Sequence, residues 1–214
     1  QNLEPSSLSG EAFDDYFAMA AKENKSKVVL WAMIQSRVVV ALVYEDWDLL
    51  RTFLPLARKH EKEGEGHYSL GFNITWVAIS HYDLYHMTGK NLHKREGRRA
   101  HRRIKKFVTN GAAMLLGPLQ LLDAMETLCV KNHPLSKVDK CFEKAFVALS
   151  KSGNSFMQAL GNERLAKLYL QEEVDETKGK RYLGDAIRLY QRWGAFEKVE
   201  WLEKRYNHLA MLVE

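Results

Sequence analysis

The residues best suited to chemistry lie in a basic stretch, KNLHKREGRRAHRRIKK, which runs from Lys90 to Lys106 and holds nine Lys or Arg residues against one Glu. The whole chain of 214 residues carries a net charge of +5 at pH 7, so the residues outside this stretch together carry −3. On a helix with about 100° per residue, Ala100, Ile104, Phe107 and Val108 share one face. Six cations lie opposite that face: Arg95, Arg98, Arg99, Arg102, Lys105 and Lys106.

A row of outward cations attracts phosphate or carboxylate groups. Three interpretations are open: a solvated outer face that keeps the protein soluble, a surface for an acidic protein partner, and a surface for nucleic acid. No aromatic residue is interleaved on the basic face for base stacking, and no nucleic-acid-binding motif accompanies the charge. The sequence therefore favours an acidic partner over nucleic acid.

The other reactive residue types form no recognisable catalytic or metal-binding pattern. His81 and His86 stand about 140° apart on a helix, and no HExxH or comparable ligand set occurs. Cys129 and Cys141 lack CxxC spacing. The chain also has neither a GxxxxGK[ST] loop nor a kinase catalytic motif. We therefore expect no metal, no cofactor and no enzymatic activity.

Helices must position these residues, because Ala, Leu, Lys, Glu and Arg are abundant and only four prolines occur. Apolar periodicity and capping residues predict a succession of helices after a polar lead segment, residues 1–10. Pro55 predicts a kink or a later start of its helix. The helices are expected to begin near Glu11 and then to span 27–44, 46–61, 70–88, 92–108, 113–130, 135–150, 155–172, 180–193 and 196–212.

The apolar run from Val28 to Tyr44 is long enough to suggest a membrane span, but Gln35, Ser36 and Arg37 stand at its middle. A central arginine costs about 2.5 to 3.5 kcal/mol on insertion scales, and the run is near the lower length limit for a span. We therefore expect a helix buried between neighbouring helices and no transmembrane segment. A cytoplasmic location is favoured, with a processed organellar protein as the alternative because the chain begins at Gln1.

Two segments repeat each other at an offset of 41 residues: KCFEKAFVALSKSG, residues 140–153, and RYLGDAIRLYQRWG, residues 181–194. Ala145 then corresponds to Ala186, and Gly153 to Gly194. Stacked helical hairpins need a small residue where helices approach and a glycine just past the helix end. The offset exceeds the 34 residues of a tetratricopeptide repeat, so we predict an all-α, divergent tetratricopeptide-like, right-handed solenoid.

The last predicted helix, residues 196–212, has a single apolar stripe that includes Val199, Leu202 and Tyr206. A helix with one apolar face is typical of the cap that ends a solenoid. Trp201 lies off this stripe. It is interpreted either as an aromatic residue that rests on the preceding turn or as a contact for a partner.

The segments LLDAMETL, FEKAFVALSKSGN, ALGNERLAKLYL and YLGDAIRLYQRWGAFEKVEWLEKRY carry a family resemblance. Residues 119–206 resemble the C-terminal helical-repeat region of large signalling proteins that contain a kinase-like segment and a P-loop ATPase. In that family a sensor histidine kinase or a nucleotide cyclase often follows. The most specific match is Trp193, Gly194 and Ala195 followed by Lys198, while the acidic insertion EEVDETKG departs from the family. The resemblance implies a scaffold or regulatory role.

Together these observations predict one helical-repeat domain over residues 11–214, closed by the helix 196–212. The expected function is a non-catalytic module for protein–protein interaction, acting as a regulatory or assembly subunit or as part of a multidomain signalling ATPase. The alternative is a nucleic-acid-associated protein that uses the basic face of helix 92–108.

Overall fold

The computed structural model describes residues 27–130, 134–171 and 175–207, and every regular element within these ranges is a helix. The expected all-α class is confirmed. The lead segment 1–10, the helix expected near Glu11 and the end of the helix expected over 196–212 lie outside the described residues. Where one domain over 11–214 is expected, the chain divides into two compact units between Gly111 and Ala112. Gly111 has a φ of +98°, a conformation that does not continue a helix.

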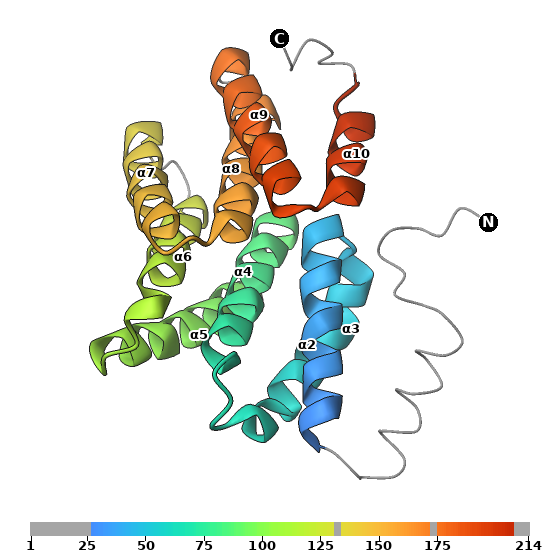
Figure 1. Cartoon of the computed structure of the whole chain (residues 1–214), viewed down its shortest axis with the longest axis vertical. Helices are drawn as coiled ribbons and strands as arrows, with labels where there is room; N and C mark the ends of the chain where they lie inside the picture. Colours follow the sequence, from blue (N-terminus) through green and yellow to red (C-terminus); the bar gives the residue numbers. More distant parts are fainter. Residues whose placement is uncertain (1–26, 131–133, 172–174, 208–214) are drawn as a thin grey trace, which may run out of the picture. The chain divides into compact units, whose positions relative to one another are not determined.

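The first unit ends at Gly111 and is built from two helical pairs (Figure 1). Its described elements are α2 (Lys27–Tyr44), α3 (Trp47–Lys59), the 3₁₀ helix η1 (Glu61–Gly64), α4 (Leu70–Thr88) and α5 (Asn91–Thr109). Helix α2 packs on α3, and α4 packs on α5. Helix α2 also contacts η1 and α4, so it joins the two pairs into one core.

Helix α2 is long and apolar enough to cross a membrane by length and composition, and half of its residues are buried inside the protein. The buried residues include the polar Gln35 and Arg37 as well as Trp31. The guanidinium of Arg37 lies 5.9 Å from the centre of the Phe53 ring on α3. Helix α2 therefore brings polar and aromatic side chains into the interior of the first unit.

Helix α3 begins at Trp47, because Asp46 Oδ1 accepts a hydrogen bond of 2.9 Å from the backbone N–H of Leu49. Pro55 lies inside the helix, which continues to Lys59. The expectation that Pro55 delays the start is wrong, because the cap at Asp46 closes the first turn well before the proline.

The second unit begins at Ala112 and also consists of helical pairs (Figure 1). Its described elements are η2 (Ala113–Leu115), α6 (Leu116–Leu128), α7 (Leu135–Lys151), α8 (Ser155–Gln171), α9 (Glu176–Trp193) and α10 (Phe196–Arg205). Helix α6 packs on α7 and α8 packs on α9, while α7 contacts α8 and α9 contacts α10. Successive helices of this unit are thus neighbours in space.

The residues that repeat at the 41-residue offset occupy matching environments. Ala145 and Ala186 are both fully buried. Gly153 and Gly194 follow the ends of α7 and α9 with φ values of +69° and +88°. These left-handed conformations favour glycine, so the predicted helix ends are confirmed.

Several helix boundaries differ from the sequence prediction, and the differences are largest at the start of α9 and the end of α10. Helix α9 begins at Glu176 instead of residue 180, because Asp175 Oδ1 accepts a hydrogen bond of 2.9 Å from the N–H of Lys178 and caps the helix. Part of the acidic insertion is therefore helical. Helix α10 begins at Phe196 as predicted but ends at Arg205, since Tyr206 has left helical geometry with a φ of −110°.

Candidate functional site

Helix α5 exposes its basic side because its small and apolar residues face α4. Gly97 lies so close to the ring of Tyr82 that a Cβ here would be 2.8 Å from Tyr82 Cε1. A hydrogen bond of 3.0 Å joins Tyr82 Oη and His101 Nδ1, and Ala100 and Ile104 are buried. These contacts set the rotation of α5 about its axis and thereby the direction of its charged side chains.

The structure exposes every cation that helical spacing places on the outer side of α5. These residues, here called the basic face, are Arg95, Arg98, Arg99, Arg102, Lys105 and Lys106. Phe107 and Val108, which are expected on the inward side, are only half-buried. The basic face is nevertheless not uniform, because some of its members lie next to carboxylates and others do not.

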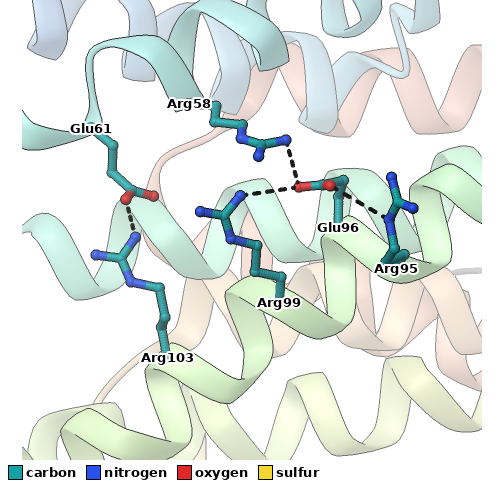
Figure 2. A network of polar contacts seen from close by, with 6 residues as sticks. All are labelled: Arg58, Glu61, Arg95, Glu96, Arg99 and Arg103. Carbon is teal, nitrogen blue, oxygen red and sulfur yellow. Dashed lines mark hydrogen bonds and ion pairs between the residues drawn. The ribbon is translucent and has the colours of Figure 1, made fainter.

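Glu96 is the centre of one ion-pair cluster. Its Oε2 accepts a hydrogen bond of 3.1 Å from Arg58 on α3 and lies 3.7 Å from Arg99 Nη1. Its Oε1 lies 3.9 Å from Arg95 Nε. Figure 2 shows the side chains of Arg58 and Arg99 converging on this carboxylate from different helices. One glutamate therefore lies within ion-pair distance of three arginines, and the cluster keeps a net positive charge.

Arg103 forms a second contact between α5 and the rest of the first unit. Its Nη1 pairs with Glu61 Oε1 at the start of η1, as Figure 2 shows. The side chains of both residues are about one-third exposed. Sequence reasoning missed this pair, because Arg103 lies off the outer side of the helix and Glu61 is 42 positions away.

The C-terminal part of the basic face differs from the part around Glu96. Among the described residues, no carboxylate forms an ion pair with Arg102, Lys105 or Lys106. All three side chains are exposed, and they follow each other at spacings of three and four residues, so they are neighbours on the helix surface. This part of α5 therefore presents uncompensated positive charge to an anionic partner.

Two histidines that are distant in sequence form a pair beside this network. His81 Nδ1 lies 3.2 Å from His93 Nδ1. Burial, together with the neighbouring His93 and Arg58, lowers the pKa of His81 to about 4. Burial and Lys90 also lower the pKa of His93. The described residues contain no group of three or more His, Cys, Asp or Glu side chains placed to hold a metal ion.

Trp201, the other candidate from the sequence, is half-buried on α10. The Lys198 ammonium lies 3.7 Å from the centre of the Trp201 ring, and the Arg205 guanidinium lies 4.8 Å from it. Both cations come from the same helix, three residues before the tryptophan and four residues after it. The structure therefore places the ring in cation–π contact within α10.

A buried charge cluster in the second unit was not anticipated from the sequence. Glu163 on α8 is fully buried, and its Oε1 accepts hydrogen bonds from Lys198 Nζ at 3.0 Å and from Arg164 Nη1 at 3.1 Å. The Tyr190 hydroxyl donates to Glu163 Oε2 at 2.9 Å, and Lys167 Nζ lies 3.6 Å from Oε1. The cluster joins α8, α9 and α10 around a single carboxylate.

Burial and charge act in opposite directions on the pKa of Glu163. Burial raises it, but Lys198 and Arg164, with hydrogen bonds from Lys198 and Tyr190, lower it below its ordinary value. Burial lowers the pKa of Lys198 to about 8, although Glu163 partly offsets this effect. Burial also lowers the pKa of Lys167. The carboxylate is thus held ionised by cations that are themselves desolvated.

The sequence contained one signal for this cluster. Helix α8 carries buried apolar residues on both sides of Glu163, including Leu160, Leu165 and Ala166. A charged residue that lies between apolar residues on both sides of a packed helix is buried with them and needs an ion-pair partner. The partner could not be read in the same way, because Lys198 lies 35 positions away in a helix that otherwise has a single apolar stripe.

Comparison of the chain with protein-family models, with curated proteins and with solved structures gives no match.

Proposed function

We propose that this protein is a non-catalytic helical module that binds an acidic protein partner through the basic face of α5. The observation that carries the proposal is the exposure of Arg102, Lys105 and Lys106 without ion pairs among the described residues. Exposed charges of one sign attract an oppositely charged surface and raise its association rate. Arg95, Arg98 and Arg99 extend the same face.

We further propose that the helical pairs are divergent tetratricopeptide-like repeats of a right-handed solenoid that serves as a scaffold. The packing of α6 on α7 and of α8 on α9 supports this proposal, as do the matching environments of Ala145 and Ala186. The resemblance of residues 119–206 to helical-repeat regions of ATPase-containing signalling proteins supports a regulatory or assembly role within such a system. Trp201 is a second candidate for partner contact.

An acidic protein is favoured over nucleic acid as the partner. Proteins that bind single strands without sequence preference combine a basic groove with aromatic side chains on which bases stack. The basic face contains only Arg and Lys, and Phe107, the aromatic residue nearest to it on α5, is half-buried. Nucleic acid therefore enters as an alternative outcome of the binding test.

The test compares two charge-reversed variants of the full chain. One variant changes Arg102, Lys105 and Lys106 to Glu. The control changes three exposed cations of the second unit, Lys137, Lys151 and Arg192, to Glu and so alters the net charge equally. The probes are a fluorescent acidic peptide of mixed Glu and Leu residues and a single-stranded oligonucleotide of similar length, both measured by anisotropy at physiological salt.

We expect the wild type and the control to bind the acidic peptide and the α5 variant to lose about tenfold or more in affinity. Equal losses in both variants would show that only net charge matters, and this would overturn the proposal. Binding of the oligonucleotide alone, with an affinity that falls steeply as salt increases, would assign the surface to nucleic acid instead.

A further inference from the structure

An open groove of about 630 Å³ lies between α6 and α7, which pack on each other in the second unit (Figure 1). Every residue that lines it belongs to η2, to α6, or to α7 and the cap at its end. Ala113, Gly117 and Ala148 contribute only short side chains or none. At Gly117 the helices are so close that a Cβ would lie 3.0 Å from Leu149 Cδ2. Small residues at this close approach therefore leave a hollow between the two helices.

The groove exposes large apolar side chains on both helices. Leu116 on α6 is 45% exposed and Val147 on α7 is 56% exposed, and both line the groove. Met114, beside the lining residue Ala113, is 59% exposed. Single exposed apolar residues are normal on protein surfaces, whereas several gathered along one hollow mark an interaction surface.

Lysines of α7 border these apolar side chains. Lys140, Lys144 and Lys151 line the groove together with Glu143, so three positive charges stand against one negative charge. All four side chains are exposed. Among the described residues, no carboxylate forms an ion pair with any of the three lysines. The groove therefore combines an apolar surface with cations that are available to the carboxylates of a partner.

The lysines are distributed along the groove. Lys140, Lys144, Val147 and Lys151 follow one another at spacings of four, three and four residues, so they form one stripe on the surface of α7. With a rise of 1.5 Å per residue, this stripe is about 16 Å long, or three helical turns. A ligand that uses all three lysines must therefore carry negative charges along its length.

We propose that the groove between α6 and α7 binds an acidic amphipathic helix of a partner protein. Such a helix docks through apolar side chains at positions i, i+3, i+4 and i+7. These side chains contact Leu116 and Val147, and glutamates beside them pair with the lysines of α7. A fatty acid has the same two kinds of chemistry but carries its charge at one end, whereas the lysines extend over three turns. The distribution of the charge therefore favours the helix.

This groove is separate from the basic face of α5, because its lining belongs to the second unit and α5 belongs to the first. All binding measurements therefore use the full chain with Arg102, Lys105 and Lys106 changed to Glu. In this background the basic face repels an acidic probe, so any binding has another origin. The groove proposal and the basic-face proposal can then fail separately.

The probe is a fluorescent peptide of about 14 residues, or four helical turns, with Leu on one face, Glu on both flanks and Ala elsewhere. One comparison peptide has the same composition in scrambled order and so lacks an apolar face, and another has Lys in place of Glu. Decanoate serves as the acyl anion. Anisotropy gives the affinities, and circular dichroism reports helix content. We expect saturable binding of the patterned acidic peptide with a gain of helix, and binding of both comparison peptides that is at least about tenfold weaker.

Val147→Gln removes an apolar contact from the groove without changing any charge, and it should weaken binding of the patterned acidic peptide about five- to tenfold. Val28→Gln is the matched control, because it makes the same change at an exposed valine of α2 and should leave the affinity unchanged. Both side chains are exposed, so we expect unchanged thermal unfolding in both variants.

Lys140→Glu combined with Lys144→Glu should weaken binding about tenfold or more, because the groove then repels the glutamates of the peptide. The control combines Lys137→Glu with Arg192→Glu, which alters the net charge equally at exposed positions outside the groove lining. The proposal is overturned if the scrambled peptide binds as tightly as the patterned one, if decanoate binds and the patterned peptide does not, or if either groove variant behaves like its control.

Discussion

Replacing Glu163 by Gln tests whether the buried charge cluster holds the second unit together. The substitution keeps the shape of the side chain but removes the negative charge that faces Lys198 and Arg164. Lys198 is almost completely buried, so it cannot recover water when its partner is lost. Breaking a buried ion pair by removing one partner costs about 3 to 5 kcal/mol. This is a large fraction of the roughly 5 to 15 kcal/mol that stabilises a typical domain.

The measurement is a double-mutant cycle in urea, with helix content followed by circular dichroism at neutral pH. The variants are Glu163→Gln, Lys198→Met and the combination of both. Lys198→Met alone also leaves a buried charge, so each single variant should be strongly destabilised. In the double variant both charges are absent, and we expect it to be more stable than the sum of the single effects predicts, by about 2 kcal/mol or more.

The matched control is an exposed pair on the same terminal helix, Glu200 and Lys204, whose charged atoms lie 2.6 Å apart. Water screens this pair, so Glu200→Gln and Lys204→Met should show no measurable coupling. If the coupling between Glu163 and Lys198 were as small as in this control, the argument that burial makes the cluster essential would be refuted.

Three further predictions concern pH, packing and capping. Because the pKa of Lys198 is lowered to about 8 when folded, the unfolded state binds more protons between about pH 8 and 10.5. The unfolding free energy of the wild type should therefore rise relative to that of Lys198→Met across this window, by up to about 3 kcal/mol. If urea titrations show that the difference between the two unfolding free energies does not change with pH, the pKa shift is contradicted. Gly97→Ala places a Cβ 2.8 Å from the buried Tyr82 ring. It should destabilise the first unit by about 1 to 3 kcal/mol, although Ala has a better helix propensity than Gly. A raised melting temperature would contradict the close approach of Gly97 to Tyr82. Asp175→Ala removes the cap of α9 and should cost about 1 kcal/mol in chemical denaturation, with an unchanged value showing that the cap is not needed.

Most of the helices could be predicted from the sequence, because their signals are local. Apolar residues at helical spacing mark the buried side, and Gly153 and Gly194 mark helix ends through their left-handed backbone. The errors also have local causes. Asp175 caps α9 and starts it at Glu176, within the acidic insertion, and the cap at Asp46 starts α3 well before Pro55.

Some features of the candidate sites also follow from local sequence, whereas others depend on tertiary packing. The exposure of the basic face follows from the 100° spacing of α5, because Ala100 and Ile104 must turn inward. The pairing of Glu96 with Arg58 does not follow, since these residues are 38 positions apart and meet only when α3 lies beside α5.

The sequence by itself determined the all-α class, most helix boundaries and the side of α5 on which its cations lie. These properties depend on interactions within one helix, where spacing along the chain is also spacing in space. Only the tertiary structure decided that Glu96 and Glu61 compensate part of the basic charge and that Glu163 meets Lys198 in the core. The physical reason is that burial and ion pairing depend on which helices pack together, and the periodicity of a single helix carries no information about its neighbour.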